Sequence, residues 1–136
     1  MIIGLTTTNT WLLIVLIIIL VVWLCYRLYQ SYQVSKVAKY LTNDELKQGI
    51  RKAQVIDLRE KKNFDAGHIL GARNMPYSTL RTYYQQIRAD LPVYLYDQGR
   101  TVSKQAALFL HKKGYQKLFI LKTGYQNWDG KEKKTK

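Results

Sequence analysis

The fold of this chain is decided by the stretch from Val55 to Pro76, VIDLREKKNFDAGHILGARNMP. It opens within the apolar run Gln54 to Leu58, whose branched side chains favour a β-strand. Two further runs of the same type follow along the chain, at Pro92 to Tyr96 and at Lys117 to Leu121. The sequence therefore predicts three strands, with the quoted stretch supplying the first of them.

Helical patterns separate the predicted strands. A capping box at Thr42 to Glu45 begins a short helix that we expect to end near Arg51. Ser103 to Lys113 forms another, with Ser103 as its N-cap and Gly114 just beyond its end. Four residues at helical spacing mark one apolar face between them: Leu80, Tyr83, Tyr84 and Ile87. Alternating strands and helices predict an α/β fold, a parallel sheet with helices on both faces.

An uncharged apolar segment lies close to the N-terminus, from Trp11 to Tyr26. As a helix it would span about 24 Å. The uncharged residues 2–10 extend it toward the roughly 30 Å of a bilayer core. A cleaved signal peptide fits worse, because no basic region precedes the segment and no small-residue cleavage site follows it. The sequence predicts a transmembrane anchor at 1–29, a helical connector at 30–41, one domain at 42–130 and a disordered basic tail at 131–136.

The formal net charge of +13 on 136 residues predicts attraction to anionic partners. Arg27, Lys36 and Lys39 follow the apolar segment, whereas no Lys or Arg precedes it. Basic residues stay on the cytoplasmic side, so we expect an N-terminus outside the cell membrane and a cytoplasmic domain. Its basic surface would then lie near an anionic lipid surface. No nucleic-acid-binding signature accompanies the charge, so nucleic acid is not an expected partner.

The composition also limits the chemistry of the chain. Cys25 is the only cysteine, which excludes a disulfide within the chain and any site with several cysteine ligands. The two histidines, His68 and His111, are too few and too scattered for a zinc site. We therefore expect no metal and no other cofactor.

The stretch quoted above resembles the first signature of the rhodanese family: Val-Ile-Asp-x-Arg, an aromatic residue, Gly-His-Ile, Gly-Ala and a final Pro. The second half is also similar, since Gly114-Tyr115 precedes a strand and then Gly124 to Trp128. The resemblance covers about residues 42 to 129 and implies a rhodanese-like parallel sheet flanked by helices. The signature residues are Asp57, Arg59, Gly67, His68, Gly71, Pro76, Gly124 and Trp128.

Three signature positions suggest structural roles. Asp57 and Arg59 are expected to form an ion pair that holds the end of the first strand. His68 is expected to cap or hydrogen-bond the backbone at the turn before the next strand, rather than act as a base. These three residues are therefore expected to stabilise the fold rather than to take part in a reaction.

The resemblance implies that active members carry a cysteine directly after the fourth-strand equivalent, in a loop of the form Cys-x-x-Gly-x-Arg-Ser. Backbone N–H groups and the following helix dipole stabilise its thiolate. This chain has no cysteine there; the loop is Asp97, Gln98, Gly99, Arg100, Thr101, Val102 and Ser103.

Two registers of that loop are open. If Tyr96 ends the strand, Asp97 takes the cysteine position, Val102 the arginine position and Ser103 the serine position. If Gly99 is aligned with the family glycine, Tyr96 takes the cysteine position. We prefer Asp97, because Val93 to Tyr96 makes an unbroken strand.

Two roles for Asp97 also stay open: a carboxylate that fills the anion cradle and imitates a thiolate, or a turn or N-cap residue. Neither transfers sulfur. The sequence thus predicts a single-pass membrane-anchored rhodanese-like protein without sulfurtransferase activity, acting as a binding or scaffold module for an unknown protein partner. The alternative is a sulfurtransferase or phosphatase-type enzyme with a non-cysteine or partner-supplied nucleophile.

Overall fold

The structure is a computed structural model that describes residues 2–135. Met1 and Lys136, the outer ends of the predicted anchor and tail, lie outside the described residues. The chain divides into two compact units, Met1–Gln33 and Val34–Lys136, which are described separately.

Helix α1 (Ile2–Val37) makes up the described part of the first unit and continues into the second. Its portion Asn9–Val37 contains a stretch with a mean hydropathy of 2.7, none of which is buried within the protein. By length and composition it is a candidate membrane span. Val34, close to its end, is buried in the core of the second unit.

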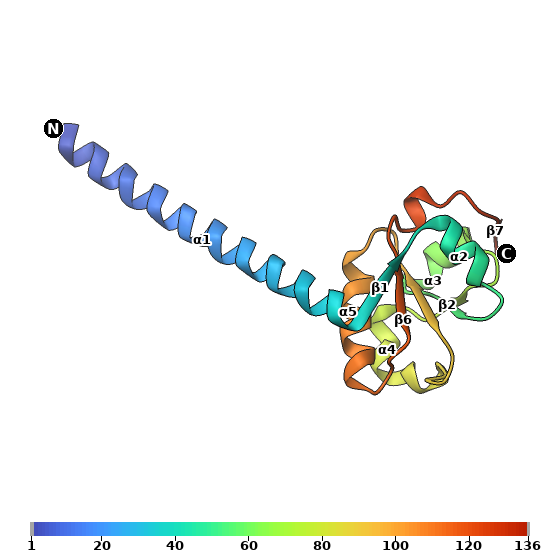
Figure 1. Ribbon diagram of the computed structural model, residues 1–136. Coiled ribbons are helices and arrows are strands. Elements are labelled where there is room, and N and C mark those ends of the chain that lie inside the picture. Colours follow the sequence, from blue (N-terminus) through green and yellow to red (C-terminus); the bar gives the residue numbers. More distant parts are fainter. Residues whose placement is uncertain (1, 136) are drawn as a thin grey trace. The chain divides into compact units, whose positions relative to one another are not determined.

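Five parallel strands form the main sheet of the second unit, in the order β1-β6-β5-β2-β4. Figure 1 shows them at the centre of this unit. The three predicted strands are confirmed and lie side by side in the middle of the sheet. Their bounds are β2 (Gln54–Asp57), β5 (Val93–Tyr96) and β6 (Leu118–Leu121); the edges are β1 (Ala38–Leu41) and β4 (Arg73–Asn74).

Strand β1 corrects the prediction that residues 30–41 form a helical connector. The helix ends at Val37, and Ala38–Leu41 pairs with β6 from Ala38 opposite Leu118 to Leu41 opposite Leu121. Ala38 and Leu41 are both buried. The run AKYL contains one residue type that favours strands, Tyr40, which is too weak a pattern to predict a strand without the pairing to β6.

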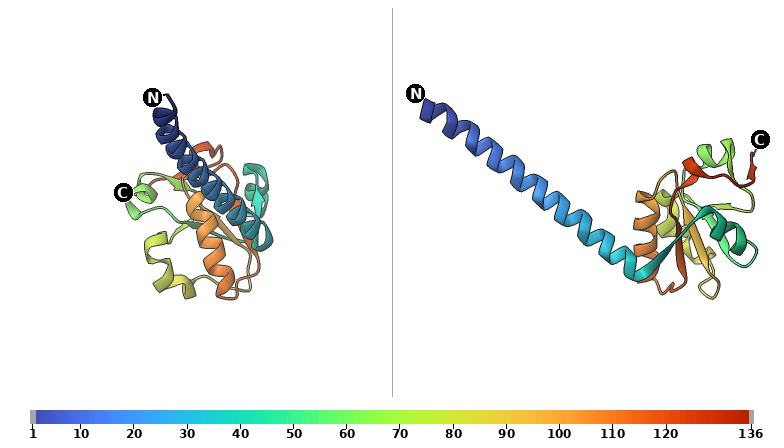
Figure 2. Two further views of the ribbon diagram at one scale, coloured as in Figure 1. Left: turned by 90° about the vertical axis from the view of Figure 1, so that its left-hand side faces the viewer. Right: turned by 45° about the horizontal axis from the view of Figure 1, so that its top comes forward.

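Two hydrophobic cores lie on opposite faces of the sheet, because successive side chains of a strand point to opposite sides. One core packs strand residues against α4 (Tyr77–Tyr83) and α5 (Thr101–Lys112). The other packs them against α2 (Asn43–Gly49) and β3 (His68–Ile69). Figure 2 shows the sheet with α5 on one side and α2 on the other. The α/β fold with a helix-flanked parallel sheet is thus confirmed.

The helix boundaries confirm one prediction and correct two. Thr42 and Glu45 form the predicted capping box of α2. Helix α5, by contrast, begins at Thr101, so Ser103 lies buried in its first turn and is not its N-cap. Helix α4 ends at Tyr83, which is half-exposed, and continues as the 3-10 turn η1 (Tyr84–Gln86). Short turns end helices at points that apolar spacing does not mark.

The predicted disordered tail is wrong for residues 131–135. Glu132–Lys133 forms β7, which pairs antiparallel with β3. The Leu70 N–H donates to the Lys131 carbonyl at 3.0 Å, and the Thr135 N–H to the Asp65 carbonyl at 2.9 Å. A charged segment has no β propensity of its own, and the unpaired edge of β3 supplies its partner. The remaining elements are α3 (Lys61–Ala66) and the 3-10 turn η2 (Tyr125–Asn127).

Candidate functional site

Strands β2 and β5 are neighbours, and their last residues, Asp57 and Tyr96, are register partners. A cavity of about 340 Å³ lies just beyond these carboxyl ends, where ligands bind in open α/β sheets. Its lining comes from the segment after β2, the start of α4 and the loop after β5: Leu58, Arg59, Glu60, Asn63, Tyr77, Ser78, Asp97, Gln98 and Val102. Three of these residues belong to the predicted active-site-like loop.

Asp97 follows β5 directly and is only 6% exposed. Its Oδ1 atom accepts hydrogen bonds from Ser103 Oγ at 2.5 Å and from the Ser103 N–H at 3.3 Å. The N-cap residue of α5 is Arg100, whose side chain makes no capping bond. Asp97 therefore is not the N-cap residue, yet its carboxylate satisfies a first-turn N–H as an N-cap side chain would.

Some of the other loop residues line the cavity and some do not. Gln98 and Val102 line the cavity, and Gln98 Oε1 accepts from Arg59 Nη1 at 3.5 Å. Arg100 does not line it, and its guanidinium carbon lies 5.5 Å from the ring centroid of Tyr40 on β1. Gly99 and Thr101 also lie outside the lining. The loop thus brings no arginine to the cavity.

The predicted ion pair between Asp57 and Arg59 is confirmed. Arg59 Nη2 lies 2.8 Å from Asp57 Oδ2, and the Asp57 side chain is fully buried. Arg59 Nη2 also donates to the Gly67 carbonyl at 2.6 Å, and its guanidinium carbon lies 4.1 Å from the Tyr125 ring centroid. The pair joins the end of β2 to the end of α3 and to η2. The positive charge of Arg59 is therefore neutralised by the buried Asp57 carboxylate and is not free for an anionic ligand.

Tyr96, which the second loop register placed at the cysteine position, ends β5 and does not line the cavity. It is fully buried, and its hydroxyl accepts a hydrogen bond from the Ile69 N–H at 3.1 Å. Burial, and after it the charge of Asp57, raises the pKa of the Tyr96 hydroxyl. Its position next to Asp57 in the sheet register was the available signal, but only strand order reveals it.

Gly124 packs closely against the backbone of the loop that follows β5. Its φ is +71°, and a Cβ there would collide with the carbonyl oxygens of Gln98 and Gly99. The next residue, Tyr125, donates its N–H to the Asp97 carbonyl at 2.9 Å. The glycine is needed because both its conformation and the close approach of two backbones exclude a side chain.

The other signature residues have structural positions. His68 Nδ1 lies 2.7 Å from the Phe64 carbonyl oxygen, which confirms the predicted backbone contact, and its ring stacks on Phe64. Pro76 precedes α4 as its N-cap residue. Gly71 and Trp128 do not lie at this site but line a second cavity.

Within residues 2–135, no group of three or more His, Cys, Asp or Glu side chains is arranged to hold a metal ion. The polar residues that line the cavity are Arg59, Glu60, Asn63, Tyr77, Ser78, Asp97 and Gln98. Ser78 Oγ donates to Glu60 Oε1 at 2.9 Å. The absence of a cofactor stays a prediction from the sequence.

Comparison with known proteins identifies the family. A family model, the rhodanese-like domain, matches residues 42–131. The chain is 48% identical over 101 residues to the uncharacterized protein YqhL of Bacillus subtilis (strain 168), covering 74% of this chain and 80% of that protein.

Solved structures share the fold. A rhodanese-related protein from Thermoplasma volcanium matches with a TM-score of 0.62 and 24% identity, over 66% of this chain and 89% of that one. A thiosulfate sulfurtransferase from Pseudomonas aeruginosa matches with a TM-score of 0.65 and 28% identity, over 71% of this chain and 20% of its own. With the family model spanning most of the second unit, the chain belongs to the rhodanese-like domain family.

Proposed function

We propose that this chain is a single-pass membrane-anchored rhodanese-like protein that does not transfer sulfur and that works as a binding or scaffold module. One observation carries the proposal. Asp97 directly follows β5, where the family pattern has its nucleophile, and its carboxylate is tied to Ser103. The only cysteine of the chain is Cys25, in α1.

The chemistry supports this reading. In sulfur transfer a thiolate attacks the donor and keeps the transferred sulfur as a persulfide, so the attacking atom has to be sulfur. A carboxylate oxygen cannot form a persulfide. In addition, one oxygen of Asp97 already accepts two hydrogen bonds, which hold the side chain against α5.

The loop register in which Asp97 replaces the cysteine is supported by the helix that follows. Ser103 lies six positions after Asp97, as in the family pattern, and both are buried in contact with each other. The alternative residue, Tyr96, belongs to the core on the other face of the sheet, with its hydroxyl bound to Ile69. Burial raises the pKa of Tyr96, which keeps its hydroxyl neutral and a poor nucleophile.

A phosphatase-type enzyme with Asp97 as nucleophile has less support. Such a site needs an arginine to hold the transferred phosphate. Arg100 packs on Tyr40 and does not line the cavity, and Val102 stands at the family's arginine position. The arginine that does line the cavity, Arg59, forms an ion pair with Asp57.

The proposed location is the cell membrane, with α1 as the span and the domain on the cytoplasmic side. Arg27, Lys36 and Lys39 follow the apolar segment, and the positive-inside tendency supports this orientation. The net charge of +13 supports further contact with anionic lipid. In this proposal the anchor concentrates the domain near a membrane-associated protein partner.

The decisive experiment measures thiosulfate-to-cyanide sulfur transfer by the full chain in lipid nanodiscs. The unmodified chain is compared with Asp97→Cys and with the double variant Asp97→Cys/Val102→Arg, which restores both loop positions. We expect no turnover from the unmodified chain, and turnover from the double variant that exceeds that of the single one. Asp97→Ser, which removes the carboxylate without adding sulfur, is the matched control and should stay inactive. Turnover by the unmodified chain would overturn the proposal.

A further inference from the structure

A second cavity, of about 810 Å³, opens on the surface of the Val34–Lys136 unit. Its walls come from α2 with the turn after it, from residues 70–71 and from residues 128–131. It shares no lining residue with the cavity at Asp97. Its volume is within the range of small-molecule sites, roughly 300–1,000 Å³.

One wall of this cavity is apolar. Ile50, Leu70 and Trp128 line it. Leu70 is 43% exposed, which is high for a leucine beside a buried strand such as β3. A ligand with a hydrocarbon or aromatic body would remove this apolar surface from water, which is favourable in proportion to the area covered.

The same wall is held in place by the backbone. The Lys131 carbonyl accepts one hydrogen bond from the Leu70 N–H at 3.0 Å and another from Trp128 Nε1 at 3.2 Å. A Cβ at Gly130 would collide with the Trp128 ring, so the chain passes directly against the indole. These contacts join both sides of the cavity before any ligand arrives, which lowers the entropy cost of binding.

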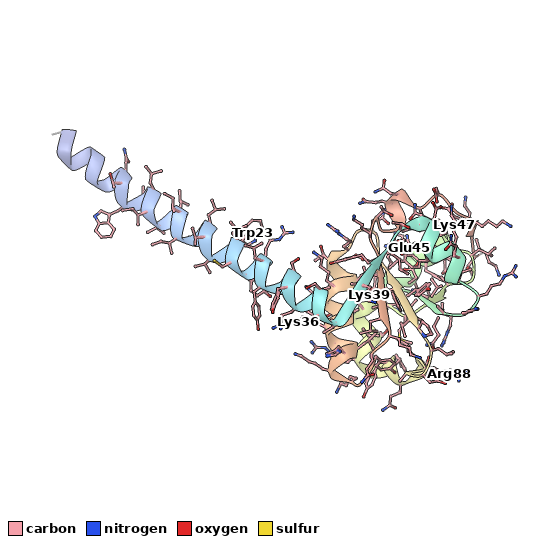
Figure 3. The ribbon with its side chains drawn as sticks, in the orientation of Figure 1. Trp23, Lys36, Lys39, Glu45, Lys47 and Arg88 are labelled. Carbon is pink, nitrogen blue, oxygen red and sulfur yellow. The ribbon has the colours of Figure 1, made fainter. Side chains whose placement is uncertain are left out.

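The polar side of the cavity is cationic. Lys47, Arg51 and Lys131 line it together with a single carboxylate, that of Asp129. Lys47 Nζ lies 2.8 Å from Asp129 Oδ1 and projects from α2 (Figure 3). Among residues 2–135, Arg51 and Lys131 form no ion pair, and both are exposed. The cavity therefore presents two uncompensated positive charges.

We propose that this cavity binds a small organic anion, a carboxylate or phosphate carried on an apolar body. The anionic group lies between Arg51 and Lys131, and the body packs on Leu70 and Trp128. The guanidinium of Arg51 offers paired N–H donors that suit both groups. The apolar wall selects against inorganic anions, and the cations select against neutral or basic compounds of the same shape.

The test uses the full chain in nanodiscs of zwitterionic lipid, labelled with 5-fluorotryptophan and followed by fluorine NMR. The signal of Trp128 is assigned with Trp128→Phe. Benzoate and phenyl phosphate are the probes, which distinguish a carboxylate from a phosphate. Benzyl alcohol and benzylamine have the apolar body but lack the anionic group, and inorganic phosphate has the anionic group but lacks the apolar body. The signals of Trp11 and Trp23, both in α1, report any partition of the probes into lipid.

We expect benzoate, phenyl phosphate or both to shift the Trp128 signal saturably, at concentrations about tenfold below any effect of the three comparison compounds. Arg51→Gln and Lys131→Gln should each weaken binding about tenfold. Lys112→Gln removes the same charge at the end of α5 and should change nothing. Asp97→Asn should also leave binding unchanged, which separates this cavity from the first. Equal binding of benzyl alcohol, no saturable shift with either anion, or full affinity in Arg51→Gln would overturn the proposal.

Discussion

The Oδ1 atom of Asp97 accepts a hydrogen bond from the hydroxyl of Ser103 at 2.5 Å, between two buried side chains. This bond joins the end of β5 to the first turn of α5. Asp97 also lines the cavity at the carboxyl edge of the sheet. The loop that carries the nucleophile in the family pattern is therefore held in place here by its own side chains.

Replacement of Ser103 by alanine should lower the free energy of unfolding by about 1–3 kcal/mol, because the buried Asp97 carboxylate loses the hydrogen bond that the Ser103 hydroxyl donates. Urea unfolding of the full chain, followed at the Trp128 fluorine signal, measures the change. Ser78→Ala removes a hydroxyl that donates to the exposed Glu60 and should cost far less. Equal losses in the two variants would contradict the role given to the Asp97 contact.

Gly124→Ala should destabilise the domain by about 2 kcal/mol or more, because it combines a positive φ with a collision against the loop backbone. Gly99→Ala is the matched control, since a Cβ at Gly99 meets no atom within 4 Å. Thermal unfolding of both variants measures the difference. A tolerated alanine at position 124 would show that the close approach of the two backbones is not needed.

Arg59→Leu should destabilise the domain by about 3–5 kcal/mol, because it leaves the buried Asp57 carboxylate without its partner. Arg88→Gln (Arg88 is labelled in Figure 3) breaks another Arg–Asp pair, with Asp90. Both side chains of that pair are mostly exposed. This substitution should leave stability nearly unchanged, because solvent screens exposed pairs. Urea unfolding at constant pH compares them, and a similar cost for both would disprove the importance of burial.

The buried hydroxyl of Tyr96 predicts a loss of stability in alkali. Burial raises its pKa in the folded state above the ordinary value of 10.0. The folded state therefore holds the proton more tightly than the unfolded state does, and the stability that this provides is complete below pH 10. As pH rises above 10, the unfolded chain ionises first, and the free energy of unfolding falls by up to about 1.4 kcal/mol per pH unit from this group.

Tyr96→Phe tests this dependence. The variant loses the bond from the Ile69 N–H and should be less stable at pH 7. It should also lose stability less steeply above pH 10, because Tyr115 and Tyr125, whose pKa values burial also raises, remain in both proteins. Parallel slopes for the variant and the unmodified chain between pH 9 and 11 would contradict the assignment.

The proposed membrane orientation predicts one-sided labelling. In a Cys25→Ser background, Lys134→Cys near the C-terminus should react with a membrane-impermeant maleimide only after the cells are opened. Asn9→Cys, at the other end of the candidate span, should react in intact cells. The reverse pattern would place the domain outside the cell.

How far the sequence predicts this fold is clear from its strands. The runs at Gln54 to Leu58, Pro92 to Tyr96 and Lys117 to Leu121 carry β-branched and aromatic residues, and all three became central strands. The short strands β1, β3, β4 and β7 were not among the three predicted. β1 pairs with β6, β4 with β2, and β3 with β7, and such short runs carry too weak a pattern to be predicted without their partners.

The site, like the fold, could be predicted only in part from the sequence. Loss of the cysteine and the likeness of the loop to the family pattern are properties of the residues in order. The contact between Asp97 and Ser103 depends on where α5 begins, two residues earlier than the apparent capping signal at Ser103. The part played by Tyr96 depends on its pairing with Asp57 across two strands.

The sequence by itself determined the rhodanese-like family, the three central strands, the Asp57–Arg59 pair and the absence of a thiol in the loop, because each is carried by residue types at short, fixed spacing. Tertiary structure alone decided that Asp97 fastens α5, that the charged C-terminal segment pairs with β3, and that Arg51 and Lys131 share one cavity. These features join residues distant in sequence, and only packing and backbone pairing bring such residues together.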